Sequence, residues 1–332
     1  MVSRMKGSGK HEPPVLAIDL GGTKIYTALV SGTGQVIARE QHPTLADEGP
    51  GAVIERIVSA VDYLLSLRKI DSSQLDSISI AAAGAIDSHQ GIITLSPNLL
   101  GWRTISLRDI VQDKCRVNTY LVNDANAAAL GEHQCGVGRG VDNLIYLTVS
   151  TGIGGGIIIN GKLYYGPNGS AGEIGHMTID VNGTKCACGN TGCLETLASG
   201  TAVAEEAIRR IRQGERSSLT GVADGAIDTI TAKEVEEEAR CGDHLASDVI
   251  FKAATYLGIG LVNMVNIFNP GMIIIGGGMS KMGDMLLNPV RRIVKERAFP
   301  ISAQVVRIVT AQLGEDSGVL GAAIFARQQK LE

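Results

Sequence analysis

The stretch VLAIDLGGTKIYTALV (residues 15–30) joins a short apolar run, a pair of glycines and a second apolar run. Residues 15–19 and 25–30 have the length and the β-branched content of buried strands, and the glycines between them are turn residues. A second turn, SGTG, then leads into QVIARE (residues 35–40). This order of strand, glycine loop, strand, turn and strand predicts an antiparallel meander.

The same pattern occurs a second time, in NLIYLTVSTGIGGGIIINGKLYYG (residues 143–166). Helical spacing of apolar residues precedes a further strand and glycine run, MIIIGGGMS (residues 272–280). Repetition on this scale predicts two αβ domains of similar design. We expect a flexible tail at residues 1–14, a smaller domain at 15–121 onto which the last helix (316–332) packs, and a larger domain at 122–315 with a helical insert near 198–240.

Composition narrows the class of protein. The chain has 332 residues, a formal net charge of −4 and 44% hydrophobic residues. The acidic balance gives no reason to expect nucleic acid or an anionic membrane as a partner. No uninterrupted apolar run has bilayer-spanning length, and the polar N-terminus lacks the apolar stretch of a signal peptide. We therefore expect a cytoplasmic protein whose six cysteines are thiols or metal ligands, not disulfides.

Three glycine loops are candidates for holding phosphate. Glycine lets backbone N–H groups approach an anion closely, and hydroxyl or ammonium groups add donors. A strand-terminal Asp beside phosphates is suited to Mg²⁺. Each loop could equally be a tight turn, and neither a P-loop nor a complete dinucleotide motif is present. Together they favour nucleotide phosphates over nicotinamide. Their residues are Asp19, Gly21, Gly22, Thr23 and Lys24; Ser150, Thr151, Gly152 and Gly154; and Gly276, Gly277 and Gly278.

A candidate general base is Asp124, in YLVNDANAAALGE, where a strand turns into a helix. An Asp at this place is commonly a helix N-cap, but Asn123 can cap equally well. A carboxylate at a helix start stays ionised, so it could orient a substrate hydroxyl and accept its proton late in phosphoryl transfer. Both roles of Asp124, helix N-cap and general base, remain open from the local sequence.

Five motifs, in this order and spacing, resemble the ROK family of bacterial sugar kinases and related repressors. They are DLGGTK, NDANAAALGE, STGIGGG, AGEIGH and CACGNTGCLE, and PNLLGW and GEIGHMTID resemble its glucokinase branch. The resemblance covers the chain from about Val15 to the final helix. It implies an α/β fold of two ribonuclease-H-like domains with a cleft between them, as in the superfamily of actin, hexokinase and heat-shock ATPases.

The resemblance also implies roles for single residues. The loops at 19–24 and 150–156 would hold the phosphates of ATP with Mg²⁺, and residues 276–278 would lie near the adenosine. Asp124 would be the catalytic base. The sugar would be bound by Gly84, Asn98, Asn123, Asp124, Glu173, His176 and Glu195. Ala83 is a departure, because many glucokinases have a proline there; it bears on the choice of sugar.

Four residues would hold zinc according to the same resemblance, namely His176, Cys186, Cys188 and Cys193. Three thiolates and one imidazole complete a tetrahedral shell, which is the arrangement of a structural site.

Planar carboxylates suit sugar hydroxyls, which supports Glu173 and Glu195 as sugar-binding residues. From the residues alone, Glu195 could instead be a first-turn helix acid and Glu173 a solvated loop acid.

These observations lead to an ATP-dependent hexose kinase, with glucose as the expected substrate and Mg²⁺ and zinc as the expected metals. The alternatives within the class are kinases of N-acetylmannosamine, N-acetylglucosamine, fructose or mannose. From another class comes a sugar-responsive repressor, which needs a DNA-binding domain; about fourteen residues precede the first strand, too few for one. A homodimer or homotetramer is expected by resemblance.

Overall fold

The computed structural model describes residues 12–96, 99–167, 169–222 and 226–330. The chain forms two compact units: unit 1 comprises residues 1–131 and 315–332, and unit 2 comprises residues 132–314. Residues 122–131 thus belong to unit 1, ten positions beyond the boundary expected from the sequence. The reason is that the strand ending at Asn123 pairs within the sheet of unit 1.

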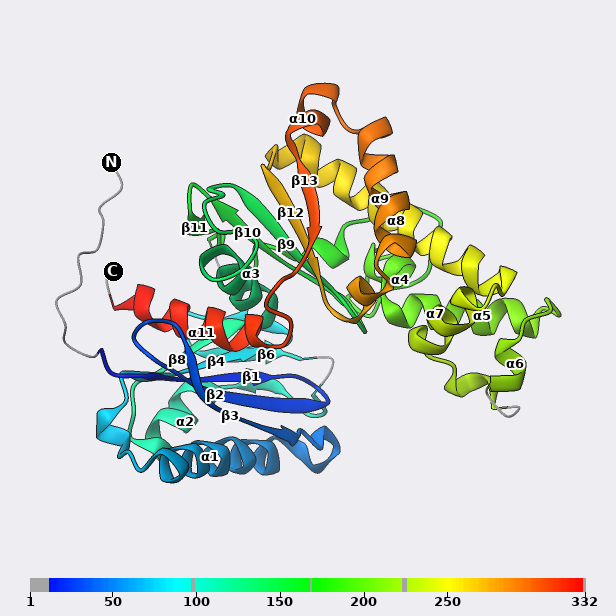
Figure 1. The fold of residues 1–332 in the computed structure, drawn as a ribbon. Coiled ribbons are helices and arrows are strands. Elements are labelled where there is room, and N and C mark those ends of the chain that lie inside the picture. Colours follow the sequence, from blue (N-terminus) through cyan, green and yellow to red (C-terminus); the bar gives the residue numbers. More distant parts are fainter. Residues whose placement is uncertain (1–11, 97–98, 168, 223–225, 331–332) are drawn as a thin grey trace. The chain divides into compact units, whose positions relative to one another are not determined.

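Unit 1 is built on a sheet with the strand order β3-β2-β1-β4-β8 (Figure 1). Its first three strands are the antiparallel meander predicted from the opening stretch, and β4 and β8 then add in parallel. A small second sheet has the order β5-β6-β7. The bounds of these strands are β1 Val15–Leu20, β2 Lys24–Val30, β3 Val36–Pro43, β4 Ser77–Ala82, β5 Ala85–Asp87, β6 Ile92–Leu95, β7 Arg103–Ile105 and β8 Thr119–Asn123.

Helices cover both faces of the larger sheet in unit 1. On one face, the apolar side of α1 (Gly49–Arg68) forms a buried core with β1, β2 and β4, to which α2 (Leu107–Cys115) also contributes. On the other face lies α11 (Asp316–Gln329), the returning C-terminal helix (Figure 1). Parallel strands need such crossover helices, so the alternation of strand and helix in the sequence determines the layers.

The helix α11 also packs on the first turns of α3 (Asp124–Gln134) at very short range. A Cβ on Gly321 would lie 1.6 Å from the carbonyl oxygen of Ala127. A Cβ on Gly131 would lie 2.3 Å from the carbonyl oxygen of Ser317. Only glycine allows two helix backbones to approach so closely, and this approach holds the start of α3 in place.

Unit 2 repeats the topology of unit 1. Its sheet has the order β11-β10-β9-β12-β13, again with three antiparallel strands followed by two parallel ones. The repeat inferred from the two glycine-loop patterns is therefore present as two sheets of the same strand order. The bounds are β9 Leu144–Val149, β10 Ile153–Ile159, β11 Lys162–Leu163, β12 Met272–Gly276 and β13 Arg307–Thr310.

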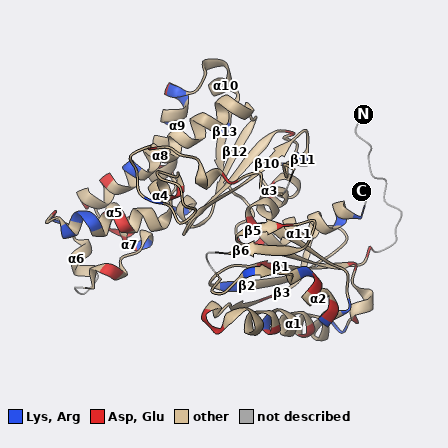
Figure 2. Cartoon of the chain, turned by 180° about the vertical axis from the view of Figure 1, so that it is seen from behind, with Lys and Arg blue, Asp and Glu red and all other residues tan. Residues whose placement is uncertain are grey.

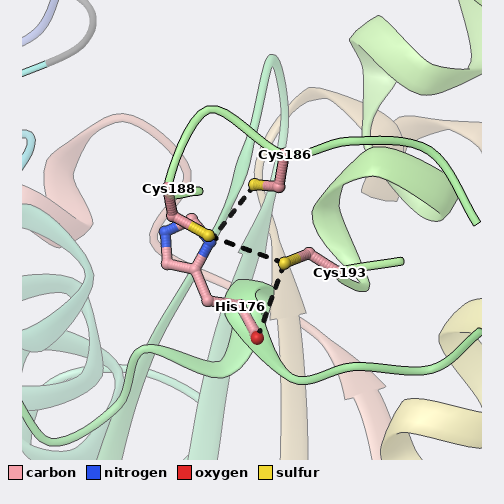
Figure 3. A group of neighbouring side chains, drawn as sticks. All are labelled: His176, Cys186, Cys188 and Cys193. Carbon is pink, nitrogen blue, oxygen red and sulfur yellow. Dashed lines mark hydrogen bonds between the residues drawn. The ribbon is translucent and has the colours of Figure 1, made fainter. Parts of the chain in front are cut away.

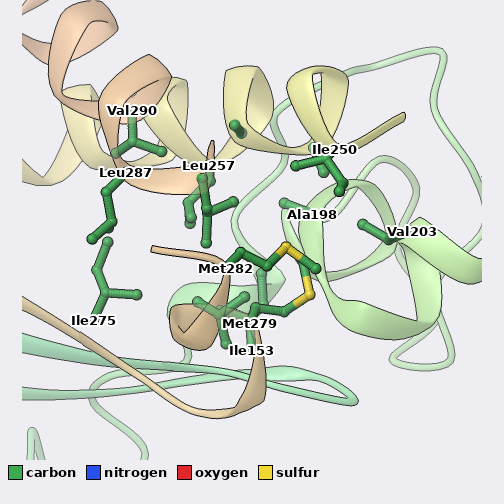
Figure 4. Close-up of a cluster of buried hydrophobic side chains, with 14 of the residues drawn as sticks. Ile153, Ala198, Val203, Ile250, Leu257, Ile275, Met279, Met282, Leu287 and Val290 are labelled. Atoms are coloured by element: carbon green, nitrogen blue, oxygen red, sulfur yellow. The ribbon is translucent and has the colours of Figure 1, made fainter. Parts of the chain in front are cut away.

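The core of unit 2 forms between this sheet and the long helix α8 (His244–Phe268), as Figure 4 shows. Leu257 of α8 and Ile275 of β12 are fully buried there, and Met279 and Met282 fill the space beside Ile153. Flexible methionine side chains suit such irregular gaps. Helices α9 (Asp284–Arg297) and α10 (Pro300–Val305) complete this region.

One helix among the described residues, α8, is long and apolar enough to cross a membrane by length and composition. Its most apolar window has a mean hydropathy of 1.4 and is 61% buried inside the protein. The expectation from the sequence concerned uninterrupted apolar runs and missed α8 as a candidate. This helix reaches the threshold as an average over apolar, small and polar residues.

The helical insert is divided into short helices and is not one long segment. These are α4 (Glu195–Ala198), α5 (Gly200–Arg212), α6 (Leu219–Val222) and α7 (Ala232–Arg240). Ser199 and Thr231 begin α5 and α7 by accepting backbone N–H groups, as N-cap residues do. Charged residues of both signs lie on α5 and α7 (Figure 2), and the apolar residues of these helices join the core of unit 2.

Candidate active site

The first glycine loop of unit 1 is a tight turn that joins β1 to β2. The backbone N–H of Gly21 donates to the carbonyl of Lys24 over 3.0 Å, and the hydroxyl of Thr44 donates to the carbonyl of Gly21 over 2.7 Å. The turn places Asp19 at the end of β1 and Lys24 at the start of β2. The loop is therefore a hairpin turn that presents an acid and a base from neighbouring strands.

The carboxyl of Asp19 is in an unusual electrostatic position. Its pKa is raised from 3.8 to about 7, chiefly by burial and then by the charge of Asp124; Lys24 lowers it and Glu315 raises it. Two neighbouring carboxylates repel each other unless a proton or a cation lies between them. The pair of Asp19 and Asp124 is therefore suited to receiving a divalent cation.

Lys24 has a partner that the sequence analysis did not identify. Its Nζ lies 2.5 Å from Oε1 of Glu315, a residue 291 positions away at the start of α11. No local pattern predicts this ion pair, because it depends on the return of the chain to unit 1. Both side chains are partly exposed, so the pair adds little to stability and leaves Lys24 free to exchange partners.

Asn123 occupies the cap position of α3 and thereby relieves Asp124 of that role. The side-chain Oδ1 of Asn123 accepts from the N–H groups of Ala125 and Asn126 over 3.0 and 3.1 Å. Oδ1 of Asp124 also accepts from the N–H of Ala125, over 2.8 Å. Asn123 is therefore the residue that bonds two N–H groups of the first turn.

Gly84 lies beside Asn123. Its carbonyl accepts from Nδ2 of Asn123 over 3.2 Å. Its φ of +116° and the 2.5 Å that would separate a Cβ from the carbonyl of Leu95 both require glycine. The predicted sugar-binding residue Asn98 lies outside the described residues.

The second glycine loop, in unit 2, is shorter than the sequence suggested. The N–H of Ser150 donates to the carbonyl of Gly152 over 2.9 Å, and β10 begins at Ile153. Gly154 is consequently a strand residue, paired with Thr148, and not part of the loop. A Cβ on Gly155 would collide with Ile174 at 2.4 Å, so the later glycines make room for the segment that carries Glu173.

The third glycine run lies next to the second loop. Because β12 runs parallel to β9, the ends of both strands meet at one edge of the sheet. A Cβ on Gly277 would lie 2.4 Å from the carbonyl of Val149, and a Cβ on Gly278 would lie 3.6 Å from Oγ of Ser150. Gly276 ends β12, where a Cβ would meet the hydroxyl of Tyr146 at 2.2 Å. The two predicted nucleotide loops of unit 2 therefore form one surface.

Three predicted sugar-binding residues of unit 2 form one group. Nε2 of His176 lies 3.8 Å from Oε2 of Glu173. Burial raises the pKa of Glu173, while His176 lowers it and the charge of Glu195 raises it. Oε2 of Glu195 accepts from the N–H of Ile153 over 2.7 Å, directly after the second glycine loop. Glu195 is thus more than a first-turn helix acid, because its side chain contacts this loop.

The four predicted metal ligands converge, as Figure 3 shows. Their ligand atoms all lie within 4.8 Å of one another. The sulfurs of Cys188 and Cys193 are 3.7 Å apart, and Sγ of Cys186 is 3.7 Å from Nδ1 of His176. Two sulfurs bound to one tetrahedral zinc at 2.3 Å would be separated by about 3.8 Å. These two separations match a tetrahedral zinc shell, and the wider pairs of the group, up to 4.8 Å, would need to close slightly around the ion.

A model of the ROK family matches residues 15–329. The chain belongs to the ROK family. A glucokinase of Halalkalibacterium halodurans is 38% identical over 321 residues, which are 95% of each chain. The crystal structure of a ROK family glucokinase from Streptomyces griseus in complex with glucose and AMPPNP has a TM-score of 0.82 and 34% identity, over 95% of this chain and 99% of that chain.

The ROK likeness is not confined to proteins named as kinases. A xylose repressor of Caldicellulosiruptor bescii is 34% identical over 92% of this chain and 76% of the repressor. The expected fold is confirmed, since solved ROK kinases share it. This ROK protein therefore has the actin-like ATPase fold, with one repeat of the ribonuclease-H-like topology in each unit.

Proposed function

We propose that this ROK protein is an ATP-dependent hexose kinase that transfers the γ-phosphoryl group to the 6-hydroxyl of glucose. The observation that carries the proposal is the likeness, over nearly the whole chain, to glucokinases at 34–38% identity, among them one solved with glucose and AMPPNP. The candidate groups described in each unit would supply what such a reaction requires.

Asp124 would serve as the base. Loose phosphoryl transfer needs the acceptor hydroxyl to be oriented and its proton taken up late in the reaction. Asp124 is suited to this because Asn123 caps α3 in its place. The neighbouring Asn123 and Gly84 are joined by a hydrogen bond, which stabilises the wall from which a sugar would be bound.

The nucleotide would be held by loops of backbone N–H groups together with Lys24. Its ion pair with Glu315 is partly exposed, so a phosphate can replace Glu315 as the partner of Lys24. Asp19 would hold Mg²⁺, directly or through water, and a bound Mg²⁺ would neutralise charge that develops on the phosphates. The raised pKa of Asp19 supports this assignment, because a cation relieves the repulsion from Asp124.

Glu173, His176 and Glu195 would bind sugar hydroxyls. Carboxylate oxygens accept two hydroxyl hydrogens at once, and Glu173 already interacts with both His176 and Glu195. His176 would serve two neighbours, since its Nδ1 lies toward the cysteine sulfurs and its Nε2 lies toward Glu173.

The cysteine cluster would hold a structural zinc ion. Burial and the neighbouring thiols raise the pKa of Cys193 to about 12, so this thiol ionises only if a cation compensates the charge. Four protein ligands fill the shell, and the ion would supply no reaction chemistry. Its effect would be to join the segment of Glu173 to the start of α4 and Glu195.

The test is a panel of hexoses with ATP and Mg²⁺, scored by kcat/KM. We expect glucose to have the highest value, and N-acetylmannosamine, N-acetylglucosamine, fructose and mannose to have lower values. A protein that binds a sugar but phosphorylates none would contradict the proposal and favour a regulator like the related xylose repressors.

The same assay tests the base. Asp124→Asn is expected to lower kcat by about 100-fold or more, the usual contribution of a general base, with AMPPNP affinity nearly unchanged. Asp113→Asn, an exposed acid on α2 of the same unit, is the matched control and should retain wild-type turnover. Near-normal turnover of Asp124→Asn would refute the mechanism.

A further inference from the structure

The start of α5 lies directly against the predicted phosphate loop at residues 150–152. The N–H of Gly200 donates to the carbonyl of Ser150 over 2.7 Å. The N–H of Thr201 points to the carbonyl of Thr151 at 3.4 Å, and the Thr201 hydroxyl donates to the same carbonyl over 2.9 Å. We call Gly200 and Thr201 the loop clamp.

These bonds account for the first free N–H groups of α5. A helix leaves its first N–H groups without partners inside the helix. In α5 the first two are directed to the carbonyls of Ser150 and Thr151, and the third, of Ala202, is bonded to Oγ of the N-cap Ser199 over 3.2 Å. The start of α5 therefore uses these groups to hold the loop, and they are not available to bind an anion directly.

The clamp determines which way the loop peptides face. In a planar trans peptide, the N–H of one residue points opposite to the carbonyl of the residue before it. Because the carbonyls of Ser150 and Thr151 are directed toward α5, the N–H groups of Thr151 and Gly152 are directed away from α5. A carbonyl oxygen repels phosphate, whereas an N–H attracts it. The clamp thus directs the N–H groups of Thr151 and Gly152 away from α5, where they could bind an anion.

A third contact holds the loop on its other side. Oε2 of Glu195 accepts from the N–H of Ile153 over 2.7 Å, so the loop is held both before and after Gly152. A Cβ on Gly152 would lie 2.4 Å from that oxygen, so a larger residue there would displace the Glu195 carboxylate. The loop is therefore supported on both sides of Gly152.

Within the clamp, only Thr201 contributes through its side chain. Gly200 acts through its backbone, and a Cβ there would lie 2.9 Å from the carbonyl of Ser150. The Thr201 hydroxyl makes the shorter of the two contacts to the carbonyl of Thr151, since the N–H lies at 3.4 Å. Its removal would leave that peptide held by the weaker contact alone.

We propose that Thr201 is a positioning residue for nucleotide phosphate: its hydroxyl holds the Thr151 carbonyl toward α5 and so presents the loop N–H groups to the phosphates of ATP. This inference rests on the proposed function in taking residues 150–152 as the phosphate loop. Thr201 acts through the loop and makes no contact with the reacting atoms.

The test compares three variants of the full-length protein. Thr201→Val removes the hydroxyl and keeps the branched shape, and Thr201→Ser keeps the hydroxyl. Thr255→Val is the matched control, because its hydroxyl donates to the carbonyl of Phe251 over 2.8 Å on α8, outside the clamp. AMPPNP affinity is measured by calorimetry, and KM for ATP and for glucose are measured separately.

We expect Thr201→Val to weaken AMPPNP binding and raise KM for ATP by about three- to tenfold, the effect of one hydrogen bond. KM for glucose should be unchanged. Thr201→Ser and Thr255→Val should match the wild type in all three quantities. Rescue by Ser would show that the hydroxyl, and not the shape of the side chain, is required.

AMPPNP affinity of Thr201→Val within twofold of wild type would overturn the inference. An equal loss in Thr255→Val, or an equal rise in both KM values of Thr201→Val, would also overturn it, since either result indicates general destabilisation. A wild type that binds AMPPNP but phosphorylates no hexose would overturn the proposed function instead, and the binding comparison would still decide the role of Thr201.

Discussion

Replacing Asp19 with Asn is expected to stabilise the ligand-free protein while removing its activity. The carboxyl of Asp19 has its pKa raised from 3.8 to about 7, chiefly by burial and then by the charge of Asp124. At neutral pH and above, the folded protein therefore holds an unfavourable negative charge at this position. Asn has nearly the same shape and no charge, so the repulsion from Asp124 disappears.

The magnitude follows from the change in pKa. A shift from 3.8 to about 7 is roughly 3 units, and each unit corresponds to about 1.4 kcal/mol. Because the pKa of Asp19 is higher in the folded than in the unfolded protein, the contribution of this carboxyl to stability is fully present below pH 3.8 and is lost as the pH rises through 7. The gain from Asp19→Asn should accordingly be near zero at pH 4 and reach about 2–4 kcal/mol at pH 8, the lower value allowing for solvent screening.

The chain offers a suitable fluorescent probe of unfolding in unit 1. Trp102 is the single tryptophan, is 1% exposed and lies in unit 1 with Asp19. Urea unfolding followed by its fluorescence, with EDTA and without nucleotide, should give the free energy of unfolding of that unit at each pH. Asp113→Asn, which removes an exposed acid of the same unit, is the control and should show no gain that depends on pH.

Two outcomes would refute this reasoning. Equal or lower stability of Asp19→Asn at pH 8 would show that the Asp19 carboxylate is not held against an electrostatic cost. A gain of the same size at pH 4 and at pH 8 would show that the effect comes from packing and not from charge. Addition of Mg²⁺ should narrow the difference, because it would stabilise the wild type and not the variant.

Two further predictions concern unit 2. Glu132 is fully buried, and its carboxylate accepts from the N–H groups of Gln312, Leu313 and Val137 over 2.8, 2.7 and 3.1 Å. Glu132→Gln should therefore lower the free energy of unfolding by about 2–4 kcal/mol and speed amide exchange at Gln312 and Leu313. Unchanged exchange at these two residues would contradict the prediction. Removal of the proposed zinc ion, or Cys186→Ser, should raise KM for glucose and also for ATP, because Glu195 at the start of α4 is a proposed sugar ligand and also contacts the residue after the loop at 150–152. Full activity of a protein verified to lack metal would exclude a supporting role for zinc.

Much of the fold could be predicted from local patterns. The meander of β1 to β3, the strand and helix joined at Asp124 and the second glycine pattern each depend on neighbours within a few residues, and each is present. The convergence of His176 with the cysteines was implied by the family motifs and is now seen as a group of ligand atoms within 4.8 Å. Strand patterns and cysteine spacing are short-range features, which is why the sequence carries them.

The glycines show where local patterns reach their limit. The local sequence predicts Gly154 in an anion-binding loop, but glycine favours both loops and close packing. The structure separates these causes: Gly152 is in the loop beside Glu195, Gly154 is in β10, and Gly155 makes room for Ile174. Which cause applies depends on what lies opposite each glycine, and that residue is distant in sequence.

By itself, the sequence determined the two repeated αβ patterns, the glycine turns at strand ends, the acid at the start of α3 and the zinc-like set of ligands. Only the tertiary structure decided the partners: Glu315 for Lys24, Asp124 beside Asp19, Glu195 on the N–H of Ile153 and the start of α5 on the loop at 150–152. The physical reason is that strand order and helix packing bring these groups together. Partners as far as 291 residues apart leave no periodic signal in the chain.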